Sequence, residues 1–185
     1  LMKLLLKLLA LVSVTLGILS CDSTEPTDEL KTGRRDYEWS VDTITSPPDL
    51  FYLFSLWGSR PANLWAVGAA DESLNSLWHY DRNVWKKTTQ RLSSNLQSIW
   101  GFDSSNVWIC DSPGGNIFHF DGLLWRDAGY YPYPGYALTY LNNVWGPKPD
   151  EIYIAGAAYD QVKGTLATLL FYDGVKWQYL NMPEK

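Results

Sequence analysis

The sequence of 185 residues contains few of the residue types that cross-link a chain or hold a metal. It has two cysteines, Cys21 and Cys110, and two histidines, His79 and His119. Its 15 basic residues are outnumbered by 20 acidic ones, which gives a formal net charge of -5. The basic surface typical of nucleic-acid binding is therefore absent, and we expect no nucleic-acid partner.

A long apolar run occurs only at the amino terminus. A short start with two lysines is followed by apolar residues 8–19 and by the small residue Ser20. This is the layout of a secretory signal peptide, which predicts that residues 1–20 are removed on export. About twelve apolar residues are too few for a helix that crosses a bilayer, which needs about twenty.

The residues at the end of this segment, Ile18-Leu19-Ser20-Cys21, resemble the bacterial lipobox. The resemblance implies that Cys21 is lipidated and anchors the chain to a bacterial membrane, in the periplasm or at the cell surface. The alternative is an ordinary cleaved signal and a soluble secreted protein. With Cys21 lipidated, Cys110 has no partner for an internal disulfide. Residues 21–36 lack aromatic side chains, and we expect them to form a flexible linker.

The rest of the chain is built from a repeat. Three stretches that begin at Ser55, Ser98 and Asn143 align without gaps, and each carries Trp-Gly at its third and fourth positions. A second block follows each stretch and contains an aspartate and, four residues later, a tryptophan. The repeated residues are Trp57, Trp100 and Trp145, then Asp81, Asp121 and Asp173, then Trp85, Trp125 and Trp177.

Each repeat contains four short runs of aromatic and β-branched residues, bounded by turn residues, and helical periodicity is missing. The strands expected in the first repeat are Tyr52–Trp57, Asn63–Gly68, Leu77–Asp81 and Val84–Thr89. Four strands in a repeat of about 40 to 50 residues are typical of a β-propeller blade. The sequence therefore predicts an all-β fold in residues 37–185, with four-stranded blades at about 45–89, 90–128 and 135–181.

The pattern resembles a bacterial propeller family whose repeats read Trp-Gly, a loop, Asn/Asp-Val-Trp-Ala-Val-Gly, and then Tyr/Phe-Asp-Gly-x-x-Trp. The resemblance covers roughly Tyr37 to Leu180. Members of this family are secreted or anchored and mostly without assigned activity, so the resemblance implies a fold and no function. We expect the repeated aromatic side chains to fill the seams between blades.

The segment Tyr37–Ile44 resembles the outer strand of a repeat, with Trp39 in the role of Trp85. We expect it to be a closing strand whose blade lacks its other strands. Propellers have about four to eight blades, so three blades form an incomplete ring with exposed apolar faces. Two explanations stay open. The chain lacks carboxyl-terminal blades of a longer protein, or several copies assemble into a closed ring as a homo-oligomer.

No metal site or cofactor is predicted. His79 and His119 occupy equivalent positions, but Phe171 stands at the third, so no ring of metal ligands is formed. Cys110 aligns with Val67 and Ala155 and is expected to be a small buried hydrophobic residue.

The repeats differ most in the loops after their second and fourth strands, which share one face of a propeller. Variable loops on a rigid scaffold are where binding sites usually lie. These loops are residues 69–76, 112–116 and 157–168 after the second strands, and 90–97 and 128–142 between blades.

Tyrosines are concentrated on this variable-loop face. Tyrosine offers a large rigid contact area with a polar tip, as on many recognition surfaces. The candidate ligand-binding residues are Tyr130, Tyr131, Tyr133, Tyr136, Tyr140 and Tyr159, with Asp71, Glu72 and Asp160 on the same face. The alternative is that a long connection folds its own rings onto the edge of a blade.

Three functions stay open. The sequence favours a non-catalytic envelope or surface lipoprotein that binds a protein or glycan through the variable-loop face. The alternatives are a fragment of a propeller glycosidase or lyase, with its catalytic groups on that face, and a structural piece of an envelope assembly. The sequence contains no paired-carboxylate motif, arginine cluster or phosphate loop, so we predict no catalytic residue.

Overall fold

A computed structural model of the chain describes residues 40–44, 51–70, 77–82, 84–93 and 95–182. Leu1–Thr43 and Ile44–Lys185 are separate units, and all described strands belong to the second. Within the described ranges, no helix is long and apolar enough to cross a membrane. The predicted signal peptide, Cys21 and linker lie outside the described residues.

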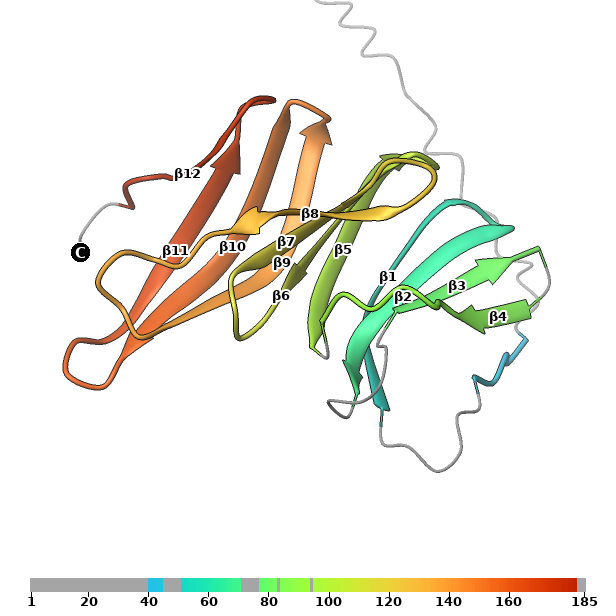
Figure 1. Ribbon diagram of the computed structural model, residues 1–185, viewed down its shortest axis with the longest axis horizontal. Helices are drawn as coiled ribbons and strands as arrows, with labels where there is room; N and C mark the ends of the chain where they lie inside the picture. Colours follow the sequence, from blue (N-terminus) through green and yellow to red (C-terminus); the bar gives the residue numbers. More distant parts are fainter. Residues whose placement is uncertain (1–39, 45–50, 71–76, 83, 94, 183–185) are drawn as a thin grey trace, which may run out of the picture. The chain divides into compact units, whose positions relative to one another are not determined.

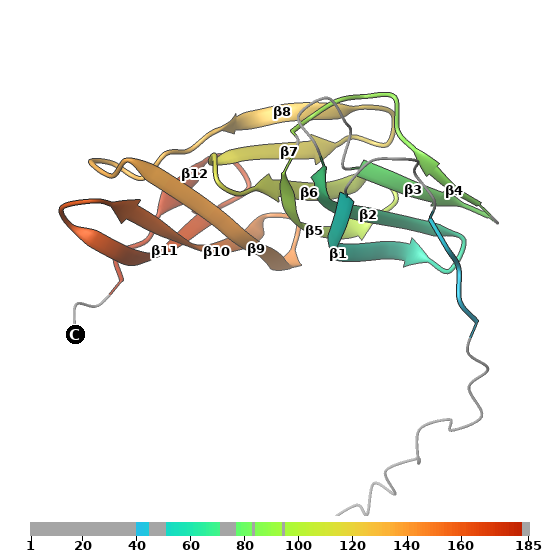
Figure 2. The same cartoon turned by 90° about the horizontal axis from the view of Figure 1, so that it is seen from below.

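In the described residues, twelve strands form three four-stranded antiparallel sheets, each with its strands in sequence order (Figures 1 and 2). Blade 1 consists of β1 (Phe51–Arg60), β2 (Asn63–Ala70), β3 (Leu77–Asp81) and β4 (Val84–Lys87). Blade 2 consists of β5 (Leu96–Asp103), β6 (Asn106–Asp111), β7 (Asn116–Phe120) and β8 (Trp125–Tyr130). Blade 3 consists of β9 (Leu138–Lys148), β10 (Glu151–Asp160), β11 (Gly164–Tyr172) and β12 (Trp177–Tyr179). The predicted fold class, all-β with four-stranded propeller blades, is confirmed.

The first strand of every blade carries a bulge at the same place in the repeat. Phe54, Gln97 and Asn142 are the extra residues at which the register with the second strand shifts. A bulge bends its strand and increases the local twist. The shared position gives the three first strands the same shape, so one packing geometry is repeated between blades.

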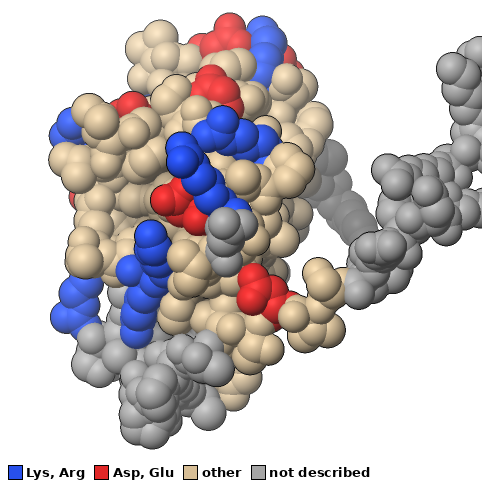
Figure 3. All heavy atoms as spheres, turned by 90° about the vertical axis from the view of Figure 1, so that its right-hand side faces the viewer, with Lys and Arg blue, Asp and Glu red and all other residues tan. Residues whose placement is uncertain are grey.

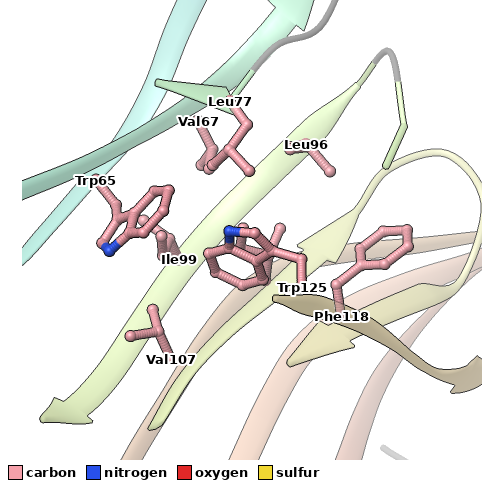
Figure 4. Close-up of a cluster of buried hydrophobic side chains, with 9 residues drawn as sticks. Trp65, Val67, Leu77, Leu96, Ile99, Val107, Phe118 and Trp125 are labelled. Atoms are coloured by element: carbon pink, nitrogen blue, oxygen red, sulfur yellow. The ribbon is translucent and has the colours of Figure 1, made fainter. Parts of the chain in front are cut away.

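The core lies between blades and not within one sheet (Figure 4). Between blades 1 and 2, the Trp65 ring meets the edge of Trp125 with 5.3 Å between ring centroids. Between blades 2 and 3, Trp108 meets Trp177 in the same way at 5.7 Å. Because the repeat places an aromatic ring at these positions in every blade, each blade covers the face of its neighbour.

The Asp-Gly positions form tight turns between the third and fourth strands. The Asp121 carboxylate accepts hydrogen bonds from the backbone N–H groups of Leu123 and Leu124, at 3.0 and 2.9 Å. These bonds, with Arg126, lower the pKa of Asp121 to about 2. Gly122 has a φ of 92°, and its counterpart in blade 1, Arg82, has a φ of 61°. Arg82 thus adopts the left-handed conformation that glycine adopts at Gly122 and Gly174 in the other two turns.

One variable loop predicted from the sequence is wrong. Residues 157–168 are not a loop, because β10 and β11 continue as a paired hairpin as far as Asp160 and Gly164. The connection between them is the short turn 161–163, in which the Asp160 carboxylate accepts backbone N–H bonds from Val162 and Lys163. The hairpin extends because its small residues still complete the backbone ladder, which depends on N–H and C=O groups alone.

Two other boundaries also differ from the prediction. The connection between blades 2 and 3 is residues 131–137, since β8 continues to Tyr130 and β9 begins at Leu138. Of the predicted closing strand, residues 37–39 lie outside the described residues, and Ser40–Ile44 has no strand structure. A strand requires a hydrogen-bonded partner, and the described part of the chain pairs none with these five residues.

Candidate functional site

Three connections meet at one end of blades 2 and 3. The backbone N–H of Gly114, between β6 and β7, donates to the carbonyl of Thr139 at 3.0 Å. Lys163 Nζ, in the β10–β11 turn, donates to the carbonyl of Gly135 at 2.5 Å. Residues 112–115, 131–137 and 161–163 therefore form one surface. The corresponding loop of blade 1, with Asp71 and Glu72, lies outside the described residues.

Asp111 organises the first of these connections. The residue is 2% exposed, and its Oδ1 accepts the backbone N–H groups of Gly115 and Asn116 at 2.9 and 2.8 Å. Its Oδ2 accepts the Asn116 side-chain amide at 2.7 Å. Charge-assisted hydrogen bonds are among the stronger ones. The carboxylate therefore closes the β6–β7 loop against β8, where Tyr131 N–H donates to the Gly115 carbonyl at 2.8 Å.

The connection 131–137, which we call the tyrosine loop, packs part of its own aromatic surface against blade 3. The Tyr131 ring lies 6.2 Å from Trp177, and its hydroxyl donates to the Ala128 carbonyl at 3.1 Å. Burial raises the pKa of Tyr131. The Tyr179 hydroxyl donates to the Tyr131 carbonyl at 2.7 Å, and burial raises the pKa of Tyr179 to about 12. Both phenols are therefore neutral at physiological pH.

The middle of the tyrosine loop is fixed by further contacts. Tyr133 N–H donates to Thr139 Oγ1 at 2.7 Å, and the Tyr133 ring lies 4.8 Å from Tyr179. Tyr136 meets Tyr133 edge-on at 5.4 Å. Lys163 Nζ lies 5.0 Å from the centroid of the Tyr136 ring, within cation–π range. Each of these side chains restrains the loop, and Tyr136 stays partly exposed.

The six predicted tyrosines do not form one surface. Thr139 and Leu141 are buried, so Tyr140, which lies between them on β9, points to the opposite side of blade 3. Tyr159 pairs with Leu138 and lies on that same outward side. Tyr140 and Tyr159 are thus separated from the tyrosine loop, while Tyr130, at the end of β8, is 62% exposed beside it. A role in binding stays a prediction for each of them.

Lys163 is the residue of this surface that the sequence did not indicate. It follows Tyr136 by 27 positions, and no motif joins the two. The contact exists because β10 and β11 extend beyond the length of the equivalent strands in blade 2, which carries the turn to the tyrosine loop. The only sequence signal for the turn that carries Lys163 was Asp160 at its start and Gly164 at its end.

The two histidines pack against the interblade tryptophans. His119 lies 4.2 Å from Trp108, and His79 lies 4.1 Å from Trp65. Nε2 of His119 donates to Asn106 Oδ1 at 3.0 Å. Within the described ranges, no group of three or more histidine, cysteine or acidic side chains is placed to hold a metal ion.

These histidines make stability depend on pH. Burial lowers the pKa of His79 and of His119 from 6.5, so the unfolded chain takes up protons at a higher pH than the folded one. Their contribution is complete above pH 6.5 and is lost as the pH falls toward the folded pKa values. We expect His119→Phe, which introduces the residue found at position 171, to reduce the loss of unfolding free energy between pH 7.5 and 5.5. The effect is a fraction of a kcal/mol, because solvent screens a half-exposed ring.

Urea unfolding at the two pH values measures this effect. Combining His119→Phe with His79→Phe should leave almost no pH dependence in this interval. An unchanged slope in the double variant would show that other groups cause it.

Cys110 does not belong to the site. Its thiol is fully buried between blades 2 and 3 and donates to the Leu141 carbonyl at 3.3 Å. Burial raises the pKa of this thiol. A nucleophilic cysteine needs thiolate character and access to solvent, so Cys110 has neither property.

The fold defines the class as a blade-repeat protein of the β-propeller type, with an aromatic loop at one end of its blades. No protein-family model matches the chain, and no curated protein matches it. It is similar to a solved structure described as YCF48 bound to D1 peptide, at 18% identity and a TM-score of 0.49, over 71% of this chain and 42% of that one. It is also similar to a fucose lectin from Kordia zhangzhouensis in complex with methyl-fucoside, at 16% identity and a TM-score of 0.43, over 70% of this chain and 99% of that one.

Proposed function

We propose that the chain is an exported, lipid-anchored and non-catalytic protein that binds a protein partner at the tyrosine loop and Tyr130. The observation that carries this proposal is the combination of a fixed loop backbone with exposed aromatic surface. Cys21, by its resemblance to a lipobox cysteine, supplies the anchor to a bacterial membrane, and residues 22–36 supply the linker.

The rigidity of the loop supports a recognition role. Hydrogen bonds hold the backbone at Tyr131, Tyr133 and Gly135. A surface that is ordered before binding loses less conformational entropy when a partner arrives. Tyr130, 62% exposed, and the accessible part of Tyr136 then offer aromatic contact area of the kind enriched in protein interfaces.

The exposed area near the loop favours a protein ligand over a glycan. Sugar hydroxyls require several polar side chains close to an aromatic platform. Here Oδ1 of Asp160 accepts two backbone N–H groups, and Lys163 Nζ uses one of its three N–H groups on the Gly135 carbonyl, so part of the polar capacity is directed into the protein. The contact area that remains is mainly aromatic, with Pro132 and Pro134 exposed beside it.

Photo-crosslinking in cells of the organism that encodes the chain tests the proposal. The full-length protein carries p-benzoylphenylalanine in place of Tyr130, and the membrane and soluble fractions are separated after irradiation. We expect an adduct of one discrete mass in the membrane fraction, with a protein identified in it by mass spectrometry. Tyr136→Ala should reduce its yield about tenfold, since an aromatic anchor at an interface contributes upward of about 1.4 kcal/mol.

The matched control carries the photoreactive residue in place of Leu123, which is exposed in a turn at the opposite end of blade 2. Equal adducts from positions 130 and 123 would contradict the binding surface. An adduct that glycosidases remove, and proteases leave intact, would replace the protein ligand with a glycan. Cys21→Ser should move the protein to the soluble fraction, and its retention in the membrane would contradict the lipid anchor.

A further inference from the structure

The two interfaces between blades are built in the same way. On one side, the tryptophan of the second strand packs against a histidine of the third strand of its own blade, Trp65 against His79 and Trp108 against His119. On the other side, the next blade presents a pair of aromatic rings from its third and fourth strands. These pairs are Phe120 with Trp125, 5.2 Å apart, and Tyr172 with Trp177, 5.0 Å apart.

A polar contact between neighbouring first strands also repeats. Ser55 Oγ of blade 1 accepts the backbone N–H of Ile99 at 3.3 Å. Ser98 Oγ of blade 2 accepts the backbone N–H of Val144 at 3.1 Å. The serine hydroxyl therefore sets the position of the next first strand along its own strand, and both interfaces have the same relative position.

A glycine of the next blade completes each interface. The Trp57 ring covers Gly101 so closely that a Cβ there would lie 2.8 Å from it. Trp100, at the same repeat position as Trp57, donates from its indole N–H to the carbonyl of Gly146 at 3.0 Å. A tryptophan over a glycine is thus part of both interfaces.

The outward face of blade 3 carries the side chains that correspond to the first side of this interface, the side with the Trp–His pair, and it faces solvent. Trp145, Tyr153 and Phe171 form one row across β9, β10 and β11, with ring centroids 6.4 and 5.0 Å apart. They hold the repeat positions of Trp100, Trp108 and His119 in blade 2. Trp145 is 49% exposed, and Asn143, at the position of Ser98, is exposed too.

The outward face of blade 1 carries the side chains that correspond to the other side of the interface, the side with the aromatic pair. Tyr80 and Trp85 form the aromatic pair of β3 and β4, 5.3 Å apart. Leu56, at the position of Ile99 and Val144, is 60% exposed, whereas its two counterparts are buried. Gly58, the counterpart of Gly101 and Gly146, is exposed as well. Figure 3 views the molecule from the side of this blade and shows mostly uncharged side chains, with acidic and basic ones among them.

Because these two faces match the two sides of the existing interfaces, we infer that the outward face of blade 3 binds the outward face of blade 1 of a second copy of the chain. Tyr153 and Phe171 of one copy pack on Tyr80 and Trp85 of the other, and Trp145 covers Gly58. Asn143 Oδ1, which accepts a hydrogen bond from Ser98 Oγ of its own chain at 3.3 Å, accepts the backbone N–H of Leu56 with its second lone pair. The chemistry of both faces is that of the two interfaces already present, so the occupant that each face fits is another blade of this repeat.

The proposal takes its number of copies from the blades of the described residues. These residues supply three blades, and two copies of them joined at both contacts supply six, inside the range of about four to eight blades found in closed propellers. Three copies would supply nine. Two copies form a ring with twofold symmetry in which each chain uses both faces, so association stops at the dimer. Tyr130 and the tyrosine loop are not part of either face.

The experiment uses residues 22–185 at about 10 µM, with molar mass measured by light scattering during size exclusion. We expect the mass of two chains. Tyr153→Glu on one face, or Leu56→Glu on the other, should each give a folded monomer, with a dissociation constant raised by roughly 100-fold or more because a carboxylate is buried without a partner. Val175→Glu, at an exposed turn of blade 3, is the matched control and should leave the dimer intact. Circular dichroism verifies the fold of each variant.

Mixing the two monomeric variants gives the decisive result. In a head-to-tail ring, one of the two contacts in the mixed dimer joins two unaltered faces, and the other joins the two altered ones. We therefore expect the equimolar mixture to recover dimers that neither variant forms alone. A monomeric wild-type chain, a polydisperse series of larger masses, or a mixture that stays monomeric would each overturn the two-copy ring.

Discussion

Trp108→Ala is expected to lower the free energy of unfolding by about 4 kcal/mol, within the range of roughly 3 to 5 kcal/mol measured for large aromatic truncations in protein cores. Trp108 is buried between blades 2 and 3, where its ring contacts His119, Tyr172 and Trp177. Its indole N–H donates to Asn106 Oδ1 at 2.7 Å. The substitution removes this contact area and leaves a cavity at the seam, which the rigid sheets on either side cannot close.

Urea unfolding of wild type and variant at one protein concentration measures this loss. Leu123→Ala is the control, because Leu123 is exposed in a turn and should change the unfolding free energy by less than about 0.5 kcal/mol. A loss below about 1.5 kcal/mol for Trp108→Ala would mean that the blades are held together by other contacts.

The second large effect is expected at Asp111. Asp111→Ala should cost about 3 kcal/mol, because it leaves buried donors on Gly115 and Asn116 without their charged acceptor. Asp111→Asn keeps one acceptor oxygen and should cost less. Since the Gly115 carbonyl holds Tyr131, the alanine variant should also reduce the photo-crosslink from position 130.

Asp173→Ala is the matched control for this prediction. Asp173 also accepts two backbone N–H groups, from Val175 and Lys176 at 2.9 Å, but in an exposed turn. Water replaces the lost acceptor there, so the cost should stay below about 1 kcal/mol. Equal losses for the two alanine variants would contradict the argument from burial. Thermal denaturation followed by circular dichroism gives both values.

The blades were predictable from the sequence because their signals are local and repeated. Asp121-Gly122 and Asp173-Gly174 indicate turns through the conformational freedom of glycine, and the strands on either side are rich in β-branched and aromatic residues. The same reasoning failed for residues 157–168. Their alanines, their glycine and Asp160 are of types depleted in strands, and the hairpin forms through backbone pairing with β9 and across its own turn.

The predicted tyrosine site was only partly assembled by the fold. Which side of a sheet a residue faces depends on strand register, and a shift by one residue reverses it. The bulge at Asn142 places Tyr140 on the outward side of blade 3, together with Tyr159. The tyrosine loop instead folds Tyr131 and Tyr133 against β12, so the alternative of a connection packed on its blade edge holds for these two rings.

The sequence by itself determined the blade as a unit, since a repeated aromatic pattern with turn residues at constant offsets permits one kind of antiparallel sheet. Only the tertiary structure decided in which blades the repeated interface residues are covered by a neighbouring blade and in which they face solvent. Trp100 is covered and Trp145 is exposed although they occupy the same repeat position, because burial depends on the neighbouring blade. The contact of Lys163 with Tyr136 likewise requires that the β10–β11 turn lies next to the tyrosine loop. The packing of the sheets sets that distance.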